Sequence, residues 1–227
     1  MSVSQRSAVA ASAASAAAAE TKTGTEAAAD AAVVSGLAQA GWAVYPGFVA
    51  ADQVLSLLAL AHAADAAGEL RPAAIGAGDA RRMRADIRGD RICWIEPPGA
   101  YPSESALLAR LDRLRSNVNR ELQLGLFDLE CHYALYPAGA RYTRHRDRFA
   151  GDDRRALSCV LYLNSAWCSA DGGQLRLHLD GGRCVDVPPE GGTLAAFLSE
   201  RIEHEVLPAT RDRASIAGWF RRRAARG

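Results

Sequence analysis

The chain has 227 residues, which is enough for one sizeable hydrophobic core but short for two. Its formal net charge of +1 at pH 7 gives no general attraction to nucleic acid or to an anionic membrane surface. The five cysteines include no CxxC pair and no spacing typical of zinc sites, and no stretch is long and apolar enough for a transmembrane helix. We therefore expect a cytoplasmic protein with reduced thiols, whose partners are neither nucleic acid nor a membrane.

The predicted elements begin after an alanine-rich start. Residues 1–29 carry almost no large apolar side chain, so they cannot bury enough surface to offset the entropy lost on ordering. We expect a flexible leader there, or a fraying helix, and one domain over residues 30–227. Helices are predicted over residues 31–40, Ala51–Ala66 and Ser103–Leu126, the last with the strongest apolar stripe.

Strands and loops alternate with these helices and then replace them. A short strand over Trp42–Tyr45 ends at a Pro-Gly turn, a loop is predicted over Leu70–Ala85, and Ile92–Ile95 indicates a further strand. After Leu126 the apolar period shortens towards two, with glycine- and proline-containing turns at short intervals. The strands predicted there are Asp128–Tyr136, Arg141–His145, Leu157–Asn164, Gln174–His178, Arg183–Val187, Thr193–Phe197, Glu203–Leu207 and Ala214–Phe220.

This series indicates a mainly β fold with N-terminal helices. Short strands separated by such turns are typical of a double-stranded β-helix, or jelly roll, in which two sheets pack face to face. We expect the jelly-roll core over about residues 127–222, with the α-helices packed on one side as support.

Two side chains of the kind that bind metals stand at alternate positions by the second of these strands. His145 and Asp147 point the same way on an extended chain, while Arg146 points to the other side. His204, on a distant strand, supplies a third ligand. Two imidazoles and one carboxylate form the facial triad that leaves coordination positions open on non-haem Fe(II). A His-x-Asp motif alone is more often a polar surface strand, so the prediction depends on what accompanies it.

The accompanying residue is Arg213. It lies just before a largely apolar run, so its guanidinium is predicted to face the interior, where a permanent charge needs a carboxylate partner. Beside an Fe(II) triad, the simplest external partner is the far carboxylate of 2-oxoglutarate, whose other end chelates the metal. The sequence therefore predicts a 2-oxoglutarate-dependent oxygenase.

Several further motifs together resemble one family. They are Asp86–Ile95, Tyr136-Pro137, Tyr142–Asp147, Val160–Asn164, Gly172–Arg176, and His204-Glu205-Val206 with Arg213 and Trp219. With them, residues from about Trp42 to Arg223 resemble the 2-oxoglutarate and Fe(II)-dependent prolyl hydroxylases of the hypoxia-inducible-factor type, including their bacterial relatives. The resemblance implies Fe(II) as cofactor, 2-oxoglutarate and O2 as co-substrates, and ascorbate as a stimulating reductant.

The resemblance also implies a role for each residue of the metal and co-substrate site. His145, Asp147 and His204 are the iron ligands and catalytic residues. Arg213 and Tyr162 are expected to hold the 5-carboxylate of 2-oxoglutarate, and a guanidinium and a phenol can indeed both donate to one carboxylate. Without Arg213, an ordinary core position would be the expectation for Tyr162.

Other residues are expected to complete the pocket and to receive the substrate. By resemblance, Asp90 and Arg155 form a pair at the active-site rim, Arg88 is assigned with them, and Trp219 walls the proline-binding side. The alternatives are an ordinary surface ion pair for Asp90 and Arg155 and a core position for Trp219. Tyr136 is expected near the metal-chelating end of 2-oxoglutarate, with strand-end packing as its alternative.

The remaining histidines and two loops receive less specific expectations. His62, His132 and His178 have no partner at ligand spacing, so each is expected to have a core or surface role. The loop Leu70–Ala85 and the segment Arg148–Arg154 differ from the family and are expected to influence substrate specificity.

The expected reaction, by resemblance, is 4-hydroxylation of a prolyl residue in a protein by a monomeric enzyme with an oxygen-sensing role. A translation factor of the elongation factor Tu type is the candidate substrate in bacteria. Two alternatives stay open: the same chemistry on a free amino acid or other small molecule, and a non-catalytic metal-binding jelly-roll sensor. The match over Asp86–Ile95 argues against the first, and Arg213 and Tyr162 argue against the second. A zinc hydrolase would need a general base beside the triad.

Overall fold

The computed structural model describes residues 24–74, 84, 86–147 and 154–223. The helices there are residues 24–40, α2 (Ala51–Ala66) and α3 (Pro102–Leu122), with short 3-10 turns η2 (Ser169–Asp171) and η3 (Asp180–Gly182). The strands are β1 (Trp42–Tyr45), β2 (Arg71–Pro72), β3 (Arg91–Ile95), β4 (Leu126–Tyr136), β5 (Tyr142–His145), β6 (Arg155–Tyr162), β7 (Leu175–His178), β8 (Cys184–Val187), β9 (Leu194–Leu198), β10 (Glu203–Val206) and β11 (Arg213–Arg222). Every strand predicted beyond Leu126 is present, so the mainly β prediction is confirmed.

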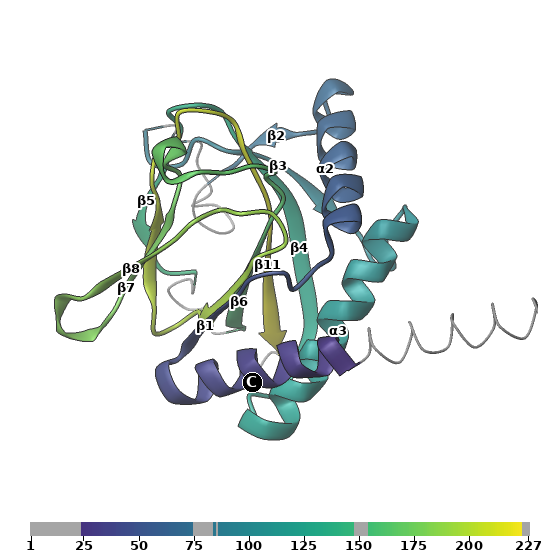
Figure 1. Cartoon of the computed structure of the whole chain (residues 1–227), viewed down its shortest axis with the longest axis vertical. Helices are drawn as coiled ribbons and strands as arrows, with labels where there is room; N and C mark the ends of the chain where they lie inside the picture. Colours follow the sequence, from purple (N-terminus) through teal and green to yellow (C-terminus); the bar gives the residue numbers. More distant parts are fainter. Residues whose placement is uncertain (1–23, 75–83, 85, 148–153, 224–227) are drawn as a thin grey trace, which may run out of the picture.

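Two antiparallel sheets form the core (Figure 1). The larger sheet has the strand order β1-β9-β6-β11-β4-β3-β2, and the smaller one has the order β5-β10-β7-β8. Tyr162 and Phe197 of the larger sheet and Leu177 and Val206 of the smaller one belong to a single buried cluster. Two sheets that share such a core form the predicted jelly roll.

The central strands of the larger sheet separate two environments by the alternation of their side chains. On β11, Ile216 and Phe220 belong to the hydrophobic cluster shared with the helices, whereas Arg213 and Trp219 line a cavity on the other face. On β4 the same alternation places His132 in the cavity wall. Every second residue of these strands therefore faces the side of the sheet where the cavity lies.

The helices lie on one side of the sheets (Figure 1). Leu107, Leu111 and Leu114 of α3 are almost fully buried in the cluster that joins the helices to the larger sheet. Their spacing places them on one face of the helix. The helices thus support the back of the strands that carry the cavity residues. Within the described residues, no helix is long and apolar enough to cross a membrane.

The N-terminal segment is already helical at residue 24, the first described residue, although the predicted start is residue 31. Residues 24–29, predicted as part of the leader, are helical, and Ala29 is buried; residues 1–23 of that prediction lie outside the described residues. Asp30 supplies the reason, because its buried carboxylate pairs with Arg110 of α3 and also accepts a hydrogen bond from Asn117 at 2.8 Å. These contacts stabilise the helix where its alanine-rich sequence shows little apolar pattern.

Helix α3 ends at Leu122, four residues before the predicted end. Gln123 adopts a left-handed backbone conformation with φ 52°, and Gly125 follows with φ 68°. A left-handed residue stops helical hydrogen bonding, so Leu126 starts β4 instead of ending the helix. Of the two predicted specificity loops, Leu70–Ala85 contains the short strand β2, while residues 75–83, 85 and 148–153 lie outside the described residues.

Candidate metal centre and co-substrate site

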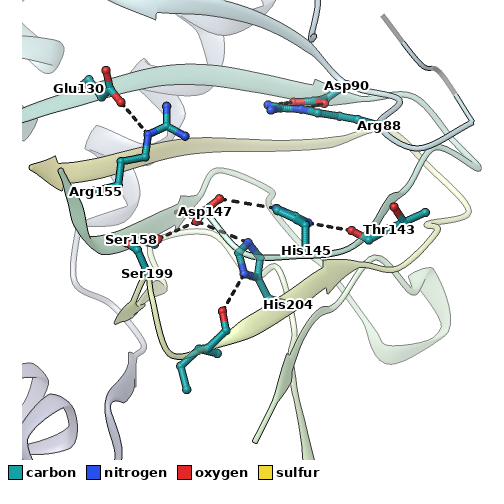
Figure 2. A network of polar contacts seen from close by, with 11 residues as sticks. Arg88, Asp90, Glu130, Thr143, His145, Asp147, Arg155, Ser158, Ser199 and His204 are labelled. Atoms are coloured by element: carbon teal, nitrogen blue, oxygen red, sulfur yellow. Dashed lines mark hydrogen bonds and ion pairs between the residues drawn. The ribbon is translucent and has the colours of Figure 1, made fainter. Parts of the chain in front are cut away.

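Three ligand-type side chains from the smaller sheet converge at one point (Figure 2). His145 ends β5, Asp147 follows it, and His204 on β10 is the direct cross-strand partner of His145. One ligand atom from each lies within 4.8 Å of the others. The Nε2 atoms of His145 and His204 are 3.6 and 3.5 Å from the carboxylate oxygens of Asp147. The structure thus brings together the predicted two-histidine, one-carboxylate set.

The hydrogen bonds behind these ligands orient them. Nδ1 of His145 donates to the Thr143 carbonyl at 2.7 Å, and Nδ1 of His204 donates to the Ile202 carbonyl at 3.4 Å. Because a carbonyl oxygen can only accept, each ring carries its proton on Nδ1 and keeps a lone pair on Nε2, on the side of the other ligands. This is the arrangement that metal-binding histidines need.

The electrostatics also suit a cation. Burial alone would raise the pKa of Asp147, but His204, His145 and a hydrogen bond from Ser158 outweigh it and hold this pKa well below its usual range. Burial lowers the pKa of His204 to about 4, so its imidazole is neutral near pH 7. A deprotonated carboxylate and a neutral imidazole are the forms that bind metals.

Arg213 and Tyr162 form a second, polar part of the site. The Arg213 side chain is 2% exposed, and no carboxylate of the described residues lies within ion-pair distance of it. Its Nε donates to the Gly173 carbonyl at 2.9 Å, and its Cζ lies 5.2 Å from the centres of both the Tyr162 and Tyr136 rings. The Tyr162 hydroxyl is fully buried and has no hydrogen-bond partner among the described residues. A buried cation and an unpaired hydroxyl together fit an external carboxylate.

One cavity connects the two parts of the site. Its wall includes His145, Asp147 and His204 together with Arg213 and Tyr136. Tyr162 is packed beside Arg213 and is not among the residues that line the cavity. A dicarboxylate reaching from the metal ligands to Arg213 would therefore stay within a single cavity. These residues fit both Fe(II) and 2-oxoglutarate.

The predicted ion pair between Asp90 and Arg155 is wrong. Asp90 is paired instead with Arg88, which donates two hydrogen bonds of 2.6 and 2.8 Å to it, and Arg155 is paired with Glu130 at 2.8 Å (Figure 2). Arg88 lies two residues before Asp90 in the sequence, so its fork-shaped guanidinium can engage both carboxylate oxygens. The two predicted rim residues consequently belong to separate ion pairs.

These pairs contact the site in different ways. The Arg88 guanidinium lies 4.8 Å from the centre of the Tyr142 ring, and that ring stacks on His145 with centroids 3.5 Å apart. The Arg155 guanidinium lies 3.6 Å from the centre of the Trp219 ring, and Trp219 lines the cavity. Arg88 therefore packs on Tyr142, which in turn packs on the metal ligand His145. Arg155 packs on Trp219 in the cavity wall.

Sequence reasoning missed three residues of the site. Ser158 on β6 hydrogen-bonds the Asp147 ligand, Tyr142 stacks on His145, and His132 lines the cavity although a core or surface role was expected for it. The available signal for Ser158 and His132 was their period of two in strands whose alternate residues are apolar. Tyr142 lies within a motif that carried the family resemblance, but nothing in that motif indicated ring stacking.

Comparison with known proteins gives consistent results. The model of the 2OG-Fe(II) oxygenase superfamily matches residues 131–221. Human prolyl hydroxylase EGLN3 is 32% identical over 183 residues, which are 77% of this chain and 74% of that protein. Longer animal relatives also match, and the chain spans 33% to 42% of the length of three of them.

Two solved structures share both fold and sequence with the chain. A crystal structure of a Pseudomonas putida prolyl-4-hydroxylase has a TM-score of 0.79 and 50% identity, covering 86% of this chain and all of that one. A Trichoplax adhaerens prolyl hydroxylase, in complex with a peptide of the hypoxia-inducible factor oxygen degradation domain, has a TM-score of 0.79 and 28% identity, covering 88% of this chain and 92% of that one. The likeness therefore extends well beyond the metal motif.

Proposed function

The chain belongs to the 2OG-Fe(II) oxygenase superfamily, and we propose that it hydroxylates a prolyl residue at the 4-position in a protein substrate. One observation carries the co-substrate assignment: Arg213 is buried beside the His145, Asp147 and His204 cluster with no carboxylate partner among the described residues. A buried guanidinium kept unpaired in this way lowers stability unless a ligand supplies the missing charge. The far carboxylate of 2-oxoglutarate is that ligand.

The roles of the residues follow from this assignment. His145, Asp147 and His204 would hold Fe(II). When bound there, Fe(II) and 2-oxoglutarate supply the oxidising chemistry, with succinate and carbon dioxide as co-products and ascorbate as a reductant that maintains Fe(II). Arg213 and Tyr162 donate hydrogen bonds to the 5-carboxylate and so fix the direction in which the co-substrate points. The protein contributes placement and electrostatics.

Tyr136 and Trp219 define the remaining walls of the cavity. Tyr136 lies beside Arg213, so it lines the space occupied by 2-oxoglutarate. Trp219 walls the side where the target proline enters, and Arg155 holds the indole from behind. The Arg88 and Asp90 pair contributes by supporting Tyr142 and thereby His145.

A protein is the proposed substrate because the Trichoplax adhaerens relative was solved with a peptide bound. We propose an elongation factor Tu-type translation factor as the substrate, and a cytoplasmic monomer as the working form of the enzyme.

The test combines a co-product assay with mass spectrometry. The protein, loaded with Fe(II), is incubated in air with 2-oxoglutarate, ascorbate and recombinant elongation factor Tu, and succinate is measured. Peptide fragmentation should then locate a mass increase of one oxygen atom on a proline. His145→Ala is the matched negative control. Succinate formation that free proline stimulates above the level without acceptor, with no modified proline in the protein, would favour a small-molecule substrate and reject the proposal.

A further inference from the structure

His132 is a buried histidine in the wall of the active-site cavity. Its side chain is 1% exposed, and its buried Nδ1 has no hydrogen-bond partner within the part of the chain that the structure describes. The same cavity is lined by the cluster of His145, Asp147 and His204. An unpaired buried polar group lowers stability, so its presence at a site calls for a functional reason.

The ring of His132 packs against two indoles. Trp94, directly opposite on β3, contacts it edge-on with centroids 4.9 Å apart, and Trp219 on β11 does so at 5.4 Å. The two indoles also contact each other, with centroids 6.4 Å apart. Trp219 is in turn covered by the guanidinium of Arg155 at 3.6 Å. Trp94 is 43% exposed, so this aromatic wall runs from the cavity to the surface. The edge-on packing of both indoles against it restricts the orientation of the imidazole.

A second unpaired donor lies in the same wall. The buried Nε1 of Trp219 likewise has no hydrogen-bond partner in residues 24–74, 84, 86–147 and 154–223, and Trp219 also lines the cavity. An indole N–H can only donate a hydrogen bond, and a neutral imidazole has one donor and one acceptor. Two neighbouring rings of one cavity wall thus have unused hydrogen-bonding capacity, with donors in the majority.

The imidazole of His132 is neutral at physiological pH. Burial lowers its pKa to about 3, and the positive charges of Arg88 and Arg155 act in the same direction. The ring therefore remains a neutral donor and acceptor. It is not part of the cluster whose ligand atoms converge on the metal position.

The hydrogen-bonding groups of His132 and Trp219 complement those of the main chain around a proline. Proline has no N–H, so the segment around it is rich in carbonyl acceptors. A neutral wall with donors in the majority complements such a segment, whereas a charged group would require its own counter-ion. We propose that His132 hydrogen-bonds to the substrate main chain beside the target proline and so determines how the proline is placed. This inference rests on the proposed prolyl substrate and assigns a specificity residue that the motifs did not indicate.

The experiment uses acetyl-L-proline methylamide, the smallest probe with a proline between two peptide groups. The full-length protein is loaded with Mn(II) and 2-oxoglutarate without oxygen, and probe binding is followed by NMR titration. His132→Met removes the ring nitrogens at similar size, His132→Gln restores a donor and an acceptor, and His62→Met at an exposed site is the control. Urea unfolding and the affinity for 2-oxoglutarate are measured for every variant.

His132→Met should bind the probe about three- to tenfold more weakly than the wild type, the effect of one neutral hydrogen bond. His132→Gln should recover part of this loss, His62→Met should bind normally, and 2-oxoglutarate affinity should not change. His132→Met should also unfold at the same or a higher urea concentration, because an unpaired polar group is removed.

Probe binding by His132→Met within twofold of the wild type would overturn this inference and leave the proposed function standing. A markedly lower unfolding midpoint for both His132 variants, with no recovery in His132→Gln, would show a structural role and also overturn it. A wild-type protein that neither binds nor hydroxylates any proline probe would reject the proposed function, and the role of His132 with it.

Discussion

Ser158 donates a 2.6 Å hydrogen bond to Oδ2 of Asp147, and both side chains are buried. Ser158 and Ser199 are also hydrogen-bonded, at 2.8 Å; because the Ser158 proton is engaged by the carboxylate, Ser199 is the donor of that bond. The result is a directed chain of hydrogen bonds, from Ser199 through Ser158 to the metal ligand (Figure 2).

Ser158→Ala should therefore weaken metal binding. Loss of the hydrogen bond behind a ligating carboxylate lowers metal affinity about 10- to 100-fold in comparable sites. Titration with Mn(II) or Co(II), monitored spectroscopically without 2-oxoglutarate, measures this directly. Ser116→Ala on the exposed face of α3 is the control. An unchanged dissociation constant in Ser158→Ala would show that the metal site does not need this hydrogen bond.

Arg213→Lys should weaken 2-oxoglutarate binding without weakening metal binding. A lysine keeps the charge but cannot present the planar, two-pronged donor of the guanidinium. We expect the KM for 2-oxoglutarate to rise about tenfold or more, equivalent to at least about 1.4 kcal/mol, while the Mn(II) dissociation constant stays within about twofold. Arg211→Lys, at an exposed arginine that contacts Trp167, should leave both unchanged. Equal losses of both affinities in Arg213→Lys would contradict the anchor role.

The metal cluster was predictable from sequence because two of its three ligands are close together in the chain. His145 and Asp147 are two residues apart, so they lie close together in space even though β5 ends at His145 and Asp147 lies just beyond the strand. The remote ligand, His204, was found because the other two already implied a third. The strand series was predictable for the same reason, since alternation and turn residues are properties of short segments.

The partners of cavity residues were not predictable, because they depend on the register between strands. His132 lies opposite Trp94 on β3, and it meets Trp219 only because β4 also pairs with β11. Likewise, Arg155 on β6 forms its ion pair with Glu130 on β4, a strand that is distant in sequence. Asp90 forms its ion pair with Arg88 instead. Such pairings are set by the hydrophobic packing of whole sheets, and the order of residues along one strand does not reveal them.

The stability of the protein should fall in mild acid, partly through His132. The pKa of His132 is about 3 in the folded state and 6.5 when exposed, because burial disfavours the charged ring. Below pH 6.5 the unfolded chain therefore binds more protons at this position, and the free energy of unfolding decreases as the pH falls towards 3.

Urea unfolding at pH 7 and pH 5 of the wild type and His132→Met measures this effect. The wild type should lose about 2 kcal/mol more than the variant over this interval, as an order of magnitude. The acid sensitivity due to His204, whose pKa is also lowered, is common to both proteins and cancels in the comparison. Equal losses in the two proteins would mean that His132 is already protonated, or is solvated, in the folded state.

The buried ion pair between Asp30 and Arg110 should be a strong determinant of stability. Asp30→Ala would leave the guanidinium of Arg110 buried between helices without its carboxylate, and breaking one side of a buried pair typically costs about 3–5 kcal/mol. The contact of Arg110 with Phe48, at 3.9 Å from guanidinium carbon to ring centre, would not offset the lost charge. The loss is measured as a lower midpoint of urea unfolding, with the dependence of the unfolding free energy on urea concentration unchanged.

Glu121→Ala is the control for this experiment, because its partner Arg120 is exposed on the same helix α3. That surface pair should contribute little or nothing measurable. Activity of the folded Asp30→Ala fraction should be normal, since the pair lies on the helix side of the larger sheet and the metal ligands lie on the other. Equal midpoints for the two variants would mean that the N-terminal helix packs through its apolar contacts alone.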